Sequence, residues 1–377
     1  MATIIDTKPH AVAGIDPHKR SGTVAVLSAT GAVLRCESFD ISTPGLAVLV
    51  AALTETAAVI DRIGVEGSSG LGRPVVLALS AAGYDVREVQ ASRTNDRRRR
   101  RHRAKTDITD AQAIAAETLA DAHLPPAGKH ASEPPAAWDA LHTIRTWRES
   151  LVLQRVRQLN EAEPVLTSLP IAIRDQLPPT SKVMAALTVL KALRLDQCGS
   201  LTAAEQLKLS RLAATREAIA AINKQLKEID QQVPQLLDTL GCTLTDIVGV
   251  GIVTAMTLLA EVGDPTRFHT EAQFARWCGA APVAASSGEG HGSPQRYRLD
   301  LAGNRQVNSV LHIVHVTQAR MHDPARSYLT RRKTEGKTIR EARRSHKRQL
   351  ANVIIRHMWN DADRLAKVQA PASTVAA

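Results

Sequence analysis

The segment from Arg97 to Ala115, RRRRRHRAKTDITDAQAIA, places a cationic run directly before two carboxylates. Asp107 and Asp110 are three residues apart, so a helix would carry both on one face. Carboxylate oxygens are ligands that Mg²⁺ and Mn²⁺ prefer, and arginine side chains bind phosphate. The segment therefore predicts an enzyme that acts on a nucleic-acid backbone with the help of a divalent metal ion.

The overall charge of the chain agrees with a polyanionic partner. The 377 residues include 48 basic and 37 acidic side chains, a formal net charge of +11, and such a balance favours nucleic acid as the partner. Only 3% of the residues are aromatic. We therefore expect contacts with the nucleic-acid backbone rather than recognition by base stacking.

The cysteine pattern and the hydropathy predict where the protein works. Cys36, Cys198, Cys242 and Cys278 lack CxxC spacing, so they predict neither a zinc site nor a disulfide framework. The N-terminus lacks the apolar core of a signal peptide, and no apolar run is long enough to span a membrane. These features predict a soluble protein of the reducing cytoplasm, with no membrane partner.

Short strands and helices alternate in the first 130 residues. Strands are expected at 11–16, 22–28, 32–39, 62–66 and 85–89, and helices at 44–56, at 72–82 and from Asp107 onward. This order predicts an α/β domain with a mixed sheet that has a parallel half. Asp16 and Glu66 end two of the strands, where an open α/β sheet usually carries its site. Together with Asp107 and Asp110, they would supply four carboxylates to one or two metal ions.

From Pro134 onward the sequence becomes helical. The segment Pro164–Pro179 predicts a loop or bend. A later apolar repeat in steps of three and four is typical of a coiled-coil seam, and Pro234 inside it should kink or restart the helix. An intramolecular hairpin and a dimerisation arm are equally consistent with this seam. Its residues are Ile219, Ile222, Leu226, Ile229, Val233, Leu236 and Leu240.

A third region, from residue 243, is helix-rich and basic. Asp246–Pro265 is similar to a helix-hairpin-helix element, in which Gly249 and Gly251 would let backbone N–H groups approach a phosphate. Gly-x-Gly turns between helices are also common without this role. His312 and His315 have no third ligand at a useful spacing, so we expect packed helix histidines there.

Each signal alone also has a structural interpretation. A single Asp at a strand end is usually structural, two acids in a first turn can simply complement the helix dipole, and an arginine run can be a solvated loop. The combination is more specific, because acids after the first and fourth strands and on the last helix rarely follow in this order by chance.

The chain resembles the insertion-sequence-110 family of transposases, also called DEDD transposases, and the related Piv-type DNA invertases. The resemblance covers essentially the whole chain, and the order of the motifs is more specific than any one of them. The matching motifs are GIDPHK at Gly14–Lys19, VEGSSGLG at Val65–Gly72, KTDITDAQAIA at Lys105–Ala115, VGVGIVTAMTLLAEVGDPTRF at Val248–Phe268, GAAPVAASSG at Gly279–Gly288 and AGNRQV at Ala302–Val307.

The resemblance implies three parts of the chain. These are an α/β RNase H-like, RuvC-like catalytic domain at 1–130, a helical coiled-coil region for dimerisation at 131–242, and a mainly α C-terminal transposase domain at 243–377. It places the DEDD tetrad on Asp16, Glu66, Asp107 and Asp110. It places a serine nucleophile on Ser287, with Ser286 as the adjacent alternative.

The resemblance also implies a bacterial, nucleoid-associated location in the cytoplasm, and it implies partners. These are Mg²⁺ or Mn²⁺, double-stranded DNA of the element ends and the target, a bridge RNA, and a homodimer that becomes a tetramer on DNA. The stretch that follows Ser287 is less basic than is typical of the family. Nucleic-acid contacts are expected at Arg97, Arg98, Arg99, Arg100, Arg101, Arg103, Lys105, Gly249 and Gly251.

The predicted function is that of a DNA transposase or recombinase with a covalent phosphoserine intermediate. Three alternatives are a RuvC-type structure-specific nuclease, a sugar-kinase-like ATPase and a non-catalytic nucleic-acid-binding protein. The nuclease would need no serine and would leave about a third of the chain without a role. The ATPase would need a Gly/Thr-rich phosphate loop where Pro17-His18-Lys19 stands.

Overall fold

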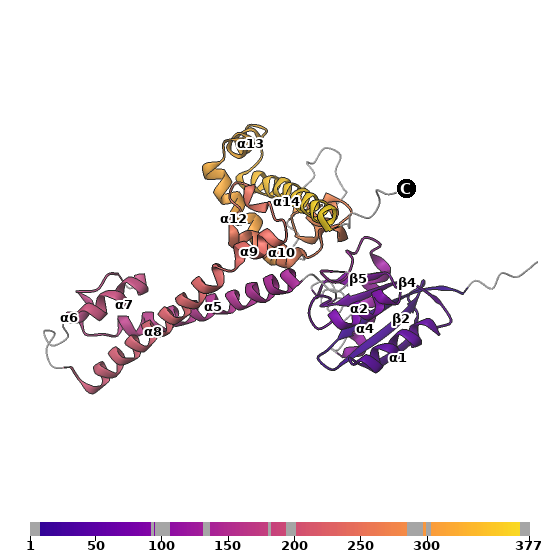
Figure 1. Ribbon diagram of the computed structural model, residues 1–377, viewed down its shortest axis with the longest axis horizontal. Helices are drawn as coiled ribbons and strands as arrows, with labels where there is room; N and C mark the ends of the chain where they lie inside the picture. The colour runs from indigo at the N-terminus through magenta and orange to yellow at the C-terminus, as the bar shows by residue number, and fades with distance from the viewer. Residues whose placement is uncertain are drawn as a thin grey trace, which may run out of the picture. The chain divides into compact units, whose positions relative to one another are not determined.

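The computed structural model describes residues 8–91, 94, 106–130, 136–179, 182–193, 201–284, 297–298 and 303–369 (Figure 1). The chain divides into two compact units. One comprises Met1–Ala136 with Leu240–Ala377, and the other comprises Ala137–Thr239. Within the described ranges, no helix combines the length and the apolar character needed to span a membrane.

Five strands of the first unit form one mixed sheet, in the order β3-β2-β1-β4-β5. The strands β1, β2 and β3 pair antiparallel, whereas β1 pairs parallel with β4, and β4 with β5. The predicted mixed sheet with a parallel half is therefore confirmed. The strands are β1 (His10–Pro17), β2 (Ser21–Ser28), β3 (Val33–Asp40), β4 (Val59–Glu66) and β5 (Val86–Val89).

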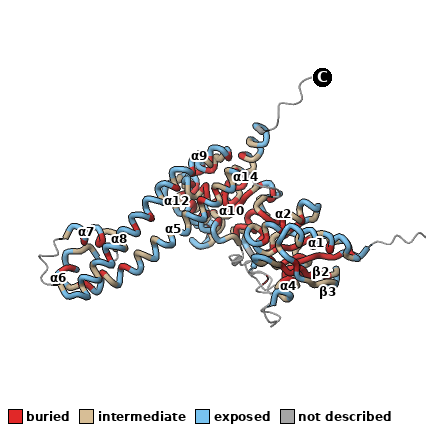
Figure 2. Tube along the Cα trace, turned by 60° about the horizontal axis from the view of Figure 1, so that its bottom comes forward, coloured by how far each residue is buried: buried red, intermediate tan, exposed pale blue. Residues whose placement is uncertain are grey.

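Helices cover both faces of the sheet, because alternate side chains of a strand point to opposite faces. Helices α1 (Thr43–Thr54) and α2 (Arg73–Ala81) pack on one face. Figure 2 shows this buried layer in red; it includes Ala13, Ile15, Leu49, Ile63, Val65, Val75 and Leu79. Helix α4 (Asp107–Ala120) covers the other face, over Val12, Leu27 and Val89.

Two glycines allow α4 to lie directly against the sheet backbone. A Cβ atom on Gly14 of β1 would stand 2.1 Å from the backbone N of Ala115 and 2.6 Å from the carbonyl O of Ala111. A Cβ atom on Gly64 of β4 would stand 1.9 Å from the hydroxyl of Thr118. Both glycines belong to the face that α4 covers, so the separation of helix and sheet depends on their missing side chains.

The remainder of the first unit is mostly helical, as expected. An aromatic cluster of Phe268, Phe274 and Trp277 lies in its core, with ring centroids 5.2–5.9 Å apart. The elements are α10 (Ile252–Val262), α11 (Glu271–Trp277), β6 (Val283–Ala284), β7 (Tyr297–Arg298), α12 (Arg305–Met321), α13 (Asp323–Thr334) and α14 (Ile339–Gln369).

The element around Gly249 differs from the expected helix-hairpin-helix. Only a 3₁₀ turn, Leu244–Asp246, precedes the glycines, and α10 follows them. Leu244, Ile247 and Val250 are all buried, but only Leu244 lies in the 3₁₀ turn, and the backbone is already extended at Ile247.

The second unit is helical. Its helices are α5 (Ala136–Thr167), α6 (Ile171–Arg174), α7 (Val183–Ala192), α8 (Ala203–Asp230) and α9 (Val233–Thr239). Arg148 and Arg155 of α5 donate from Nε to Asp230 (2.7 Å) and Asn223 (2.9 Å) of α8. Residue numbers rise along one helix as they fall along the other, so the pair is antiparallel. The two helices lie side by side in Figures 1 and 2.

The prolines of the second unit had unequal effects. Helix α8 ends before Pro234 and α9 begins there, which confirms the predicted restart. The loop or bend predicted at Pro164–Pro179 is present but begins later than expected, because α5 continues through Pro164 to Thr167, and the short α6 lies within the segment. Ala162 and Leu166, on either side of this proline, are buried in one apolar cluster. Their packing offsets the lost hydrogen bond in this last helical turn.

We predict that Gly14→Ala and Gly64→Ala each destabilise the protein by about 2–3 kcal/mol, because the added methyl group overpacks the junction between α4 and the sheet. Denaturant unfolding followed by circular dichroism measures the effect. Gly70→Ala is the matched control, since its Cβ would come no closer than 3.7 Å to another residue. Equal stability of all three variants would contradict this account of the junction.

Candidate metal centre

Asp16 and Glu66 lie at the same edge of the sheet. The parallel strands β1 and β4 are in register from Gly14 and Gly64 to Ile15 and Val65, so the next residue of each strand is an acid at the carboxyl end. Alternation also assigns both acids to the face of Gly14 and Gly64, which α4 covers. The two acids predicted at strand ends are therefore neighbours.

Asp107 and Asp110 occupy the first turn of α4. Thr106 caps this helix: its hydroxyl accepts from the Thr109 N–H at 3.1 Å, and the Thr109 hydroxyl accepts from the Thr106 N–H at 3.0 Å. Acids in the first turn are stabilised by the helix dipole. Because α4 crosses β1 at Ala111 and Ala115, its first turn projects toward the end of β1.

Asp16, His18 and Asp107 form a group that can hold a metal ion. One ligand atom from each lies within 4.8 Å of the others. His18 Nε2 is 3.6 Å from Asp16 Oδ2 and 3.4 Å from Asp107 Oδ1. The Asp16 side chain is only 15% exposed and that of Asp107 is 67% exposed, so the site has an inner and an outer acid.

The pKa of Asp16 responds to the charges of the other carboxylates at the site. Burial raises the pKa of Asp16 to about 6 from 3.8; His18 lowers this pKa, and Glu66, Asp110 and Asp107 each raise it by repulsion. All four predicted acids are thus close enough to interact. A buried acid crowded by like charges favours a cation, and oxygen donors with one imidazole suit a divalent ion such as Mg²⁺ or Mn²⁺. The donor set therefore fits a metal.

Thr94 orients Glu66. Its hydroxyl lies 2.8 Å from Glu66 Oε2 and 3.0 Å from the carbonyl O of Ala91, so it donates to one of them at a time. The residue is 4% exposed. Neither Thr94 nor His18 was predicted as a site residue. His18 could have been found from its place two residues after Asp16, whereas Thr94 has no signal in the sequence.

Other predicted site residues have different positions. Gly249 has φ +90°, and a Cβ there would lie 3.2 Å from the Thr317 side chain, which is a structural reason for this glycine. Gly251 precedes α10 and has open space around its Cβ position. Ser286 and Ser287 lie outside the described residues, as do the predicted phosphate-binding residues Arg97, Arg98, Arg99, Arg100, Arg101, Arg103 and Lys105.

Of the two α12 histidines expected to be packed, His315 is buried, whereas His312 is exposed, so the expectation holds for His315 alone. His315 Nδ1 lies 2.9 Å from His346 Nδ1 of α14, and both residues are buried. Burial lowers the pKa of His315 to about 4, so this histidine is neutral at pH 7.

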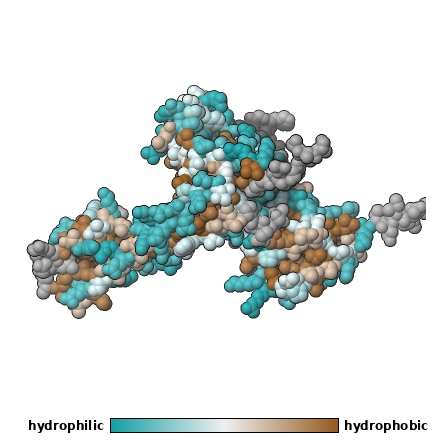
Figure 3. All heavy atoms as spheres, in the orientation of Figure 1, coloured by the Kyte–Doolittle hydropathy of each residue, from teal (hydrophilic) through white to brown (hydrophobic). Residues whose placement is uncertain are grey.

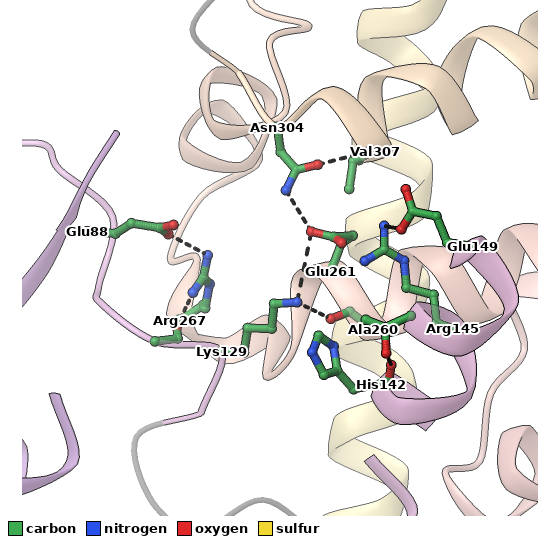
Figure 4. A network of polar contacts seen from close by, with 12 residues as sticks. Glu88, Lys129, His142, Arg145, Glu149, Ala260, Glu261, Arg267, Asn304 and Val307 are labelled. Atoms are coloured by element: carbon green, nitrogen blue, oxygen red, sulfur yellow. Dashed lines mark hydrogen bonds and ion pairs between the residues drawn. The ribbon is translucent and has the colours of Figure 1, made fainter. Parts of the chain in front are cut away.

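Buried polar contacts join β5 to the C-terminal helices within the first unit (Figure 4). Arg267 is 8% exposed; it contacts the carbonyl O of Gly128 and donates to Glu88 Oε2 at 3.2 Å. Lys129 donates from Nζ to the carbonyl O of Ala260 at 2.6 Å.

The same network continues to the start of α12. Glu261 accepts from Asn304 Nδ2 at 2.9 Å, and Asn304 caps α12 by accepting from the Val307 N–H at 2.9 Å. Buried charges require such partners. The contacts therefore fix the sheet domain against the helices on which it packs.

Two family models match the chain. One is described as "Transposase IS116/IS110/IS902 family" and matches residues 242–330, and the other is the DEDD transposase model of the IS110 type, which matches residues 13–170. Together they cover about two thirds of the chain and leave most of the second unit unmatched.

Individual proteins are also similar to the chain. The IS110 uncharacterized 43.6 kDa protein of Streptomyces coelicolor is 32% identical over 140 residues, 36% of this chain and 34% of that protein. The chain thus matches about a third of this relative's length. The IS116 uncharacterized 44.8 kDa protein of Streptomyces clavuligerus is 23% identical over 66% of this chain and 70% of its own length.

One solved structure is similar to a smaller part of the chain. It is T. thermophilus RuvC in complex with a Holliday junction substrate, which is 17% identical and matches 28% of this chain and 90% of its own, with a TM-score of 0.23.

We predict that Asp16→Asn stabilises the metal-free fold at neutral pH. The folded protein holds the Asp16 proton more tightly than the unfolded chain does, so wild type loses stability as the pH rises from about 4 to about 6. The asparagine side chain does not ionise, so the variant does not lose stability over this pH range. In EDTA, unfolding should show the variant gaining roughly 1–2 kcal/mol over wild type between pH 4 and pH 7.

Mn²⁺ provides the internal control for this measurement. A bound ion stabilises the folded state, so saturating Mn²⁺ should reverse the order and make wild type the more stable protein. If the stability difference between Asp16→Asn and wild type changes with neither pH nor Mn²⁺, Asp16 is not part of a crowded cation site.

Proposed function

Because this chain belongs to the IS116/IS110/IS902 family of transposases, we propose that it cuts and rejoins DNA to move an insertion sequence. The observation that carries the proposal is the convergence of Asp16, Glu66, Asp107 and Asp110 on one end of the sheet. The division into a catalytic domain at 1–130, a coiled-coil region at 131–242 and a transposase domain at 243–377 is part of this proposal.

The four acids would hold Mg²⁺ or Mn²⁺, with His18 as an additional neighbour. A divalent ion held there would supply polarisation of a scissile phosphate and stabilisation of charge on the oxygens that enter and leave. Asp16 is the buried anchor of the set, and Thr94 holds Glu66 in its orientation. Asp107 is the more exposed acid and would face the DNA.

The nucleophile that we propose is Ser287, with Ser286 as the alternative. The serine oxygen forms a bond to phosphorus while the bond from phosphorus to the 3′ oxygen breaks, and the serine proton passes to a nearby carboxylate. The products are a phosphoserine linked to the 5′ side of the break and a free 3′-hydroxyl. Attack by a 3′-hydroxyl on this linkage reseals the DNA, so the break needs no external energy source.

The proposed partners follow from charge and from the family. Double-stranded DNA of the element ends and the target would contact the cationic run Arg97–Lys105 and the turn at Gly249 and Gly251. A bridge RNA would select the DNA sites in a cytoplasmic, nucleoid-associated complex. The antiparallel helices α5 and α8 would form the coiled-coil arm of a homodimer, which becomes a tetramer on DNA.

The nuclease alternative is not favoured. Both family models are described as transposases, and one of them matches residues 242–330, a region that a RuvC-type nuclease would not need. Strand-transfer products on a supercoiled plasmid that carries the element ends distinguish the two activities, since a nuclease would yield nicks or breaks alone.

We predict that Glu66→Gln and Asp107→Asn each reduce DNA cleavage by roughly 10²-fold or more and weaken Mn²⁺ binding in calorimetry, because the remaining acids hold the ion poorly. Asp61→Asn is the matched control: it removes one charge from the opposite end of β4. Near-normal cleavage by either site variant would remove that residue from the tetrad.

We also predict a denaturant-resistant protein–DNA adduct that forms with wild type and disappears with Ser287→Ala. Electrophoresis of labelled DNA under denaturing conditions measures it. Ser286→Ala is the matched control and should retain the adduct. The opposite result would move the nucleophile by one residue, and the absence of an adduct from wild type would contradict covalent catalysis.

A further inference from the structure

The C-terminal helices enclose a strongly basic pocket. Its volume is about 530 Å³, and its walls are the turn Gly279–Pro282, His312 of α12, the end of α13 and the first half of α14. A single acid, Glu341, is among the lining residues. The seven cations that line it are Arg332, Lys337, Arg340, Arg343, Arg344, Lys347 and Arg348.

The spacing of the cations on α14 explains how they share one wall. Their positions follow the pattern i, i+3, i+4, i+7 and i+8 from Arg340 to Arg348, which places all five on one side of a helix. Ala342 and His346, on the other side, are buried against the rest of the domain. The sequence thus builds a cationic stripe and an apolar side on the same helical turns.

The turn before α14 adds a cation from α13. Gly336 has φ +79°, and the backbone N–H groups of Gly336 and Lys337 bond to the carbonyl groups of Lys333 and Arg332. This left-handed glycine ends α13 and reverses the chain, so that Arg332 lines the same pocket as the α14 stripe. The surface over α13 is hydrophilic in Figure 3.

Arg332 pairs with Glu335 at 2.6 Å, but the cations of α14 have no such partner among the described residues. Across the parts of the chain that the structure describes, no carboxylate forms an ion pair with Arg340, Arg343, Arg344, Lys347 or Arg348. Glu341 accepts instead from the N–H (2.9 Å) and the hydroxyl (2.8 Å) of Thr338, as the cap of α14. The one acid of the pocket is therefore held at the helix start.

Two of the arginines have buried donors without an acceptor. Arg332 Nε and Arg348 Nη1 are inaccessible and have no hydrogen-bond partner among the described residues. A buried donor that lacks an acceptor destabilises the empty pocket. The pKa of His312 also reflects the positive charge of the pocket. Burial lowers this pKa, and repulsion by Lys347 and Arg343 lowers it further. The pocket therefore favours an anion with several acceptor oxygens.

We propose that this pocket binds consecutive phosphates along one strand of double-stranded DNA. The stripe runs over nine residues of helix, which are eight steps of about 1.5 Å or about 12 Å in total. This length matches the rise of three to four nucleotides of one strand. A single small anion would use only part of that length. The choice of DNA rests on the proposed function, and the wall Gly279–Pro282 leads through β6 to Ser287, three residues further along the chain.

The test measures binding of the full-length protein to a labelled DNA duplex by fluorescence anisotropy over a series of salt concentrations, in EDTA. The variant Arg340→Gln/Arg343→Gln removes two exposed pocket cations. It should weaken binding and reduce the log–log salt slope by about 1.8, or about 0.9 for each phosphate contact. Arg348→Gln should reduce it by about 0.9.

The matched control is Arg320→Gln/Lys333→Gln, which removes two exposed cations of the same domain that do not line the pocket. Its slope should equal that of wild type, and the melting temperatures of both double variants should be unchanged. Equal losses in the two double variants would reduce the effect to net charge and overturn the proposal. An unchanged salt slope in the pocket variant would also overturn the proposal. The same holds if the variant loses affinity for an RNA duplex but not for a DNA duplex.

The same experiment separates this inference from the proposed function, because no cleavage takes place in EDTA. A pocket-dependent salt slope in a protein whose cleavage does not depend on Asp16 would support the pocket and contradict the metal mechanism. If cleavage depends on Asp16 but the pocket variant keeps a normal salt slope, the metal mechanism is supported and the DNA-binding pocket is contradicted.

Discussion

The site depends on the close contact between α4 and the sheet at Gly14 and Gly64. A methyl group at either glycine would fall within about 2 Å of α4, so no other residue permits this separation. The same contact determines where the first turn of α4 lies, and with it the carboxylates of Asp107 and Asp110. Packing of the helix and assembly of the four acids are therefore one event, and a change of helix position would disperse the acids.

Without a metal ion, the four acids destabilise the folded state that brings them together. Asp16 is buried beside like charges, and its burial, with their repulsion, raises its pKa to about 6, so the metal-free site disfavours ionisation of this acid. The apolar layers on both faces of the sheet offset this cost, since Ile15 and Val65, next to the two strand acids, are fully buried. The Thr106–Thr109 capping box adds a local contribution at the start of α4.

Local patterns predicted much of this arrangement. Alternating apolar residues identified the strands, and acids at their ends identified Asp16 and Glu66. Contacts between distant residues were not predictable in this way. Arg267 reads as a surface arginine, yet its partner Glu88 is 179 residues away and Gly128 is 139 residues away. Thr94 lacks any local signal, and the helical Pro164 depends on packing with α6 and α7.

The proposed metal site and the basic pocket have opposite electrostatic roles. Before a divalent ion binds, the cluster of carboxylates would repel a phosphate of the proposed DNA substrate, with an energy on the order of several kcal/mol for each close pair of charges. Cations placed elsewhere would then supply the attraction for DNA. The α14 stripe has five cations that no carboxylate in the described chain neutralises, and the network of Arg267 and Lys129 joins its domain to the sheet. Binding energy gained at the basic pocket can therefore hold a phosphate against repulsion at the acidic site.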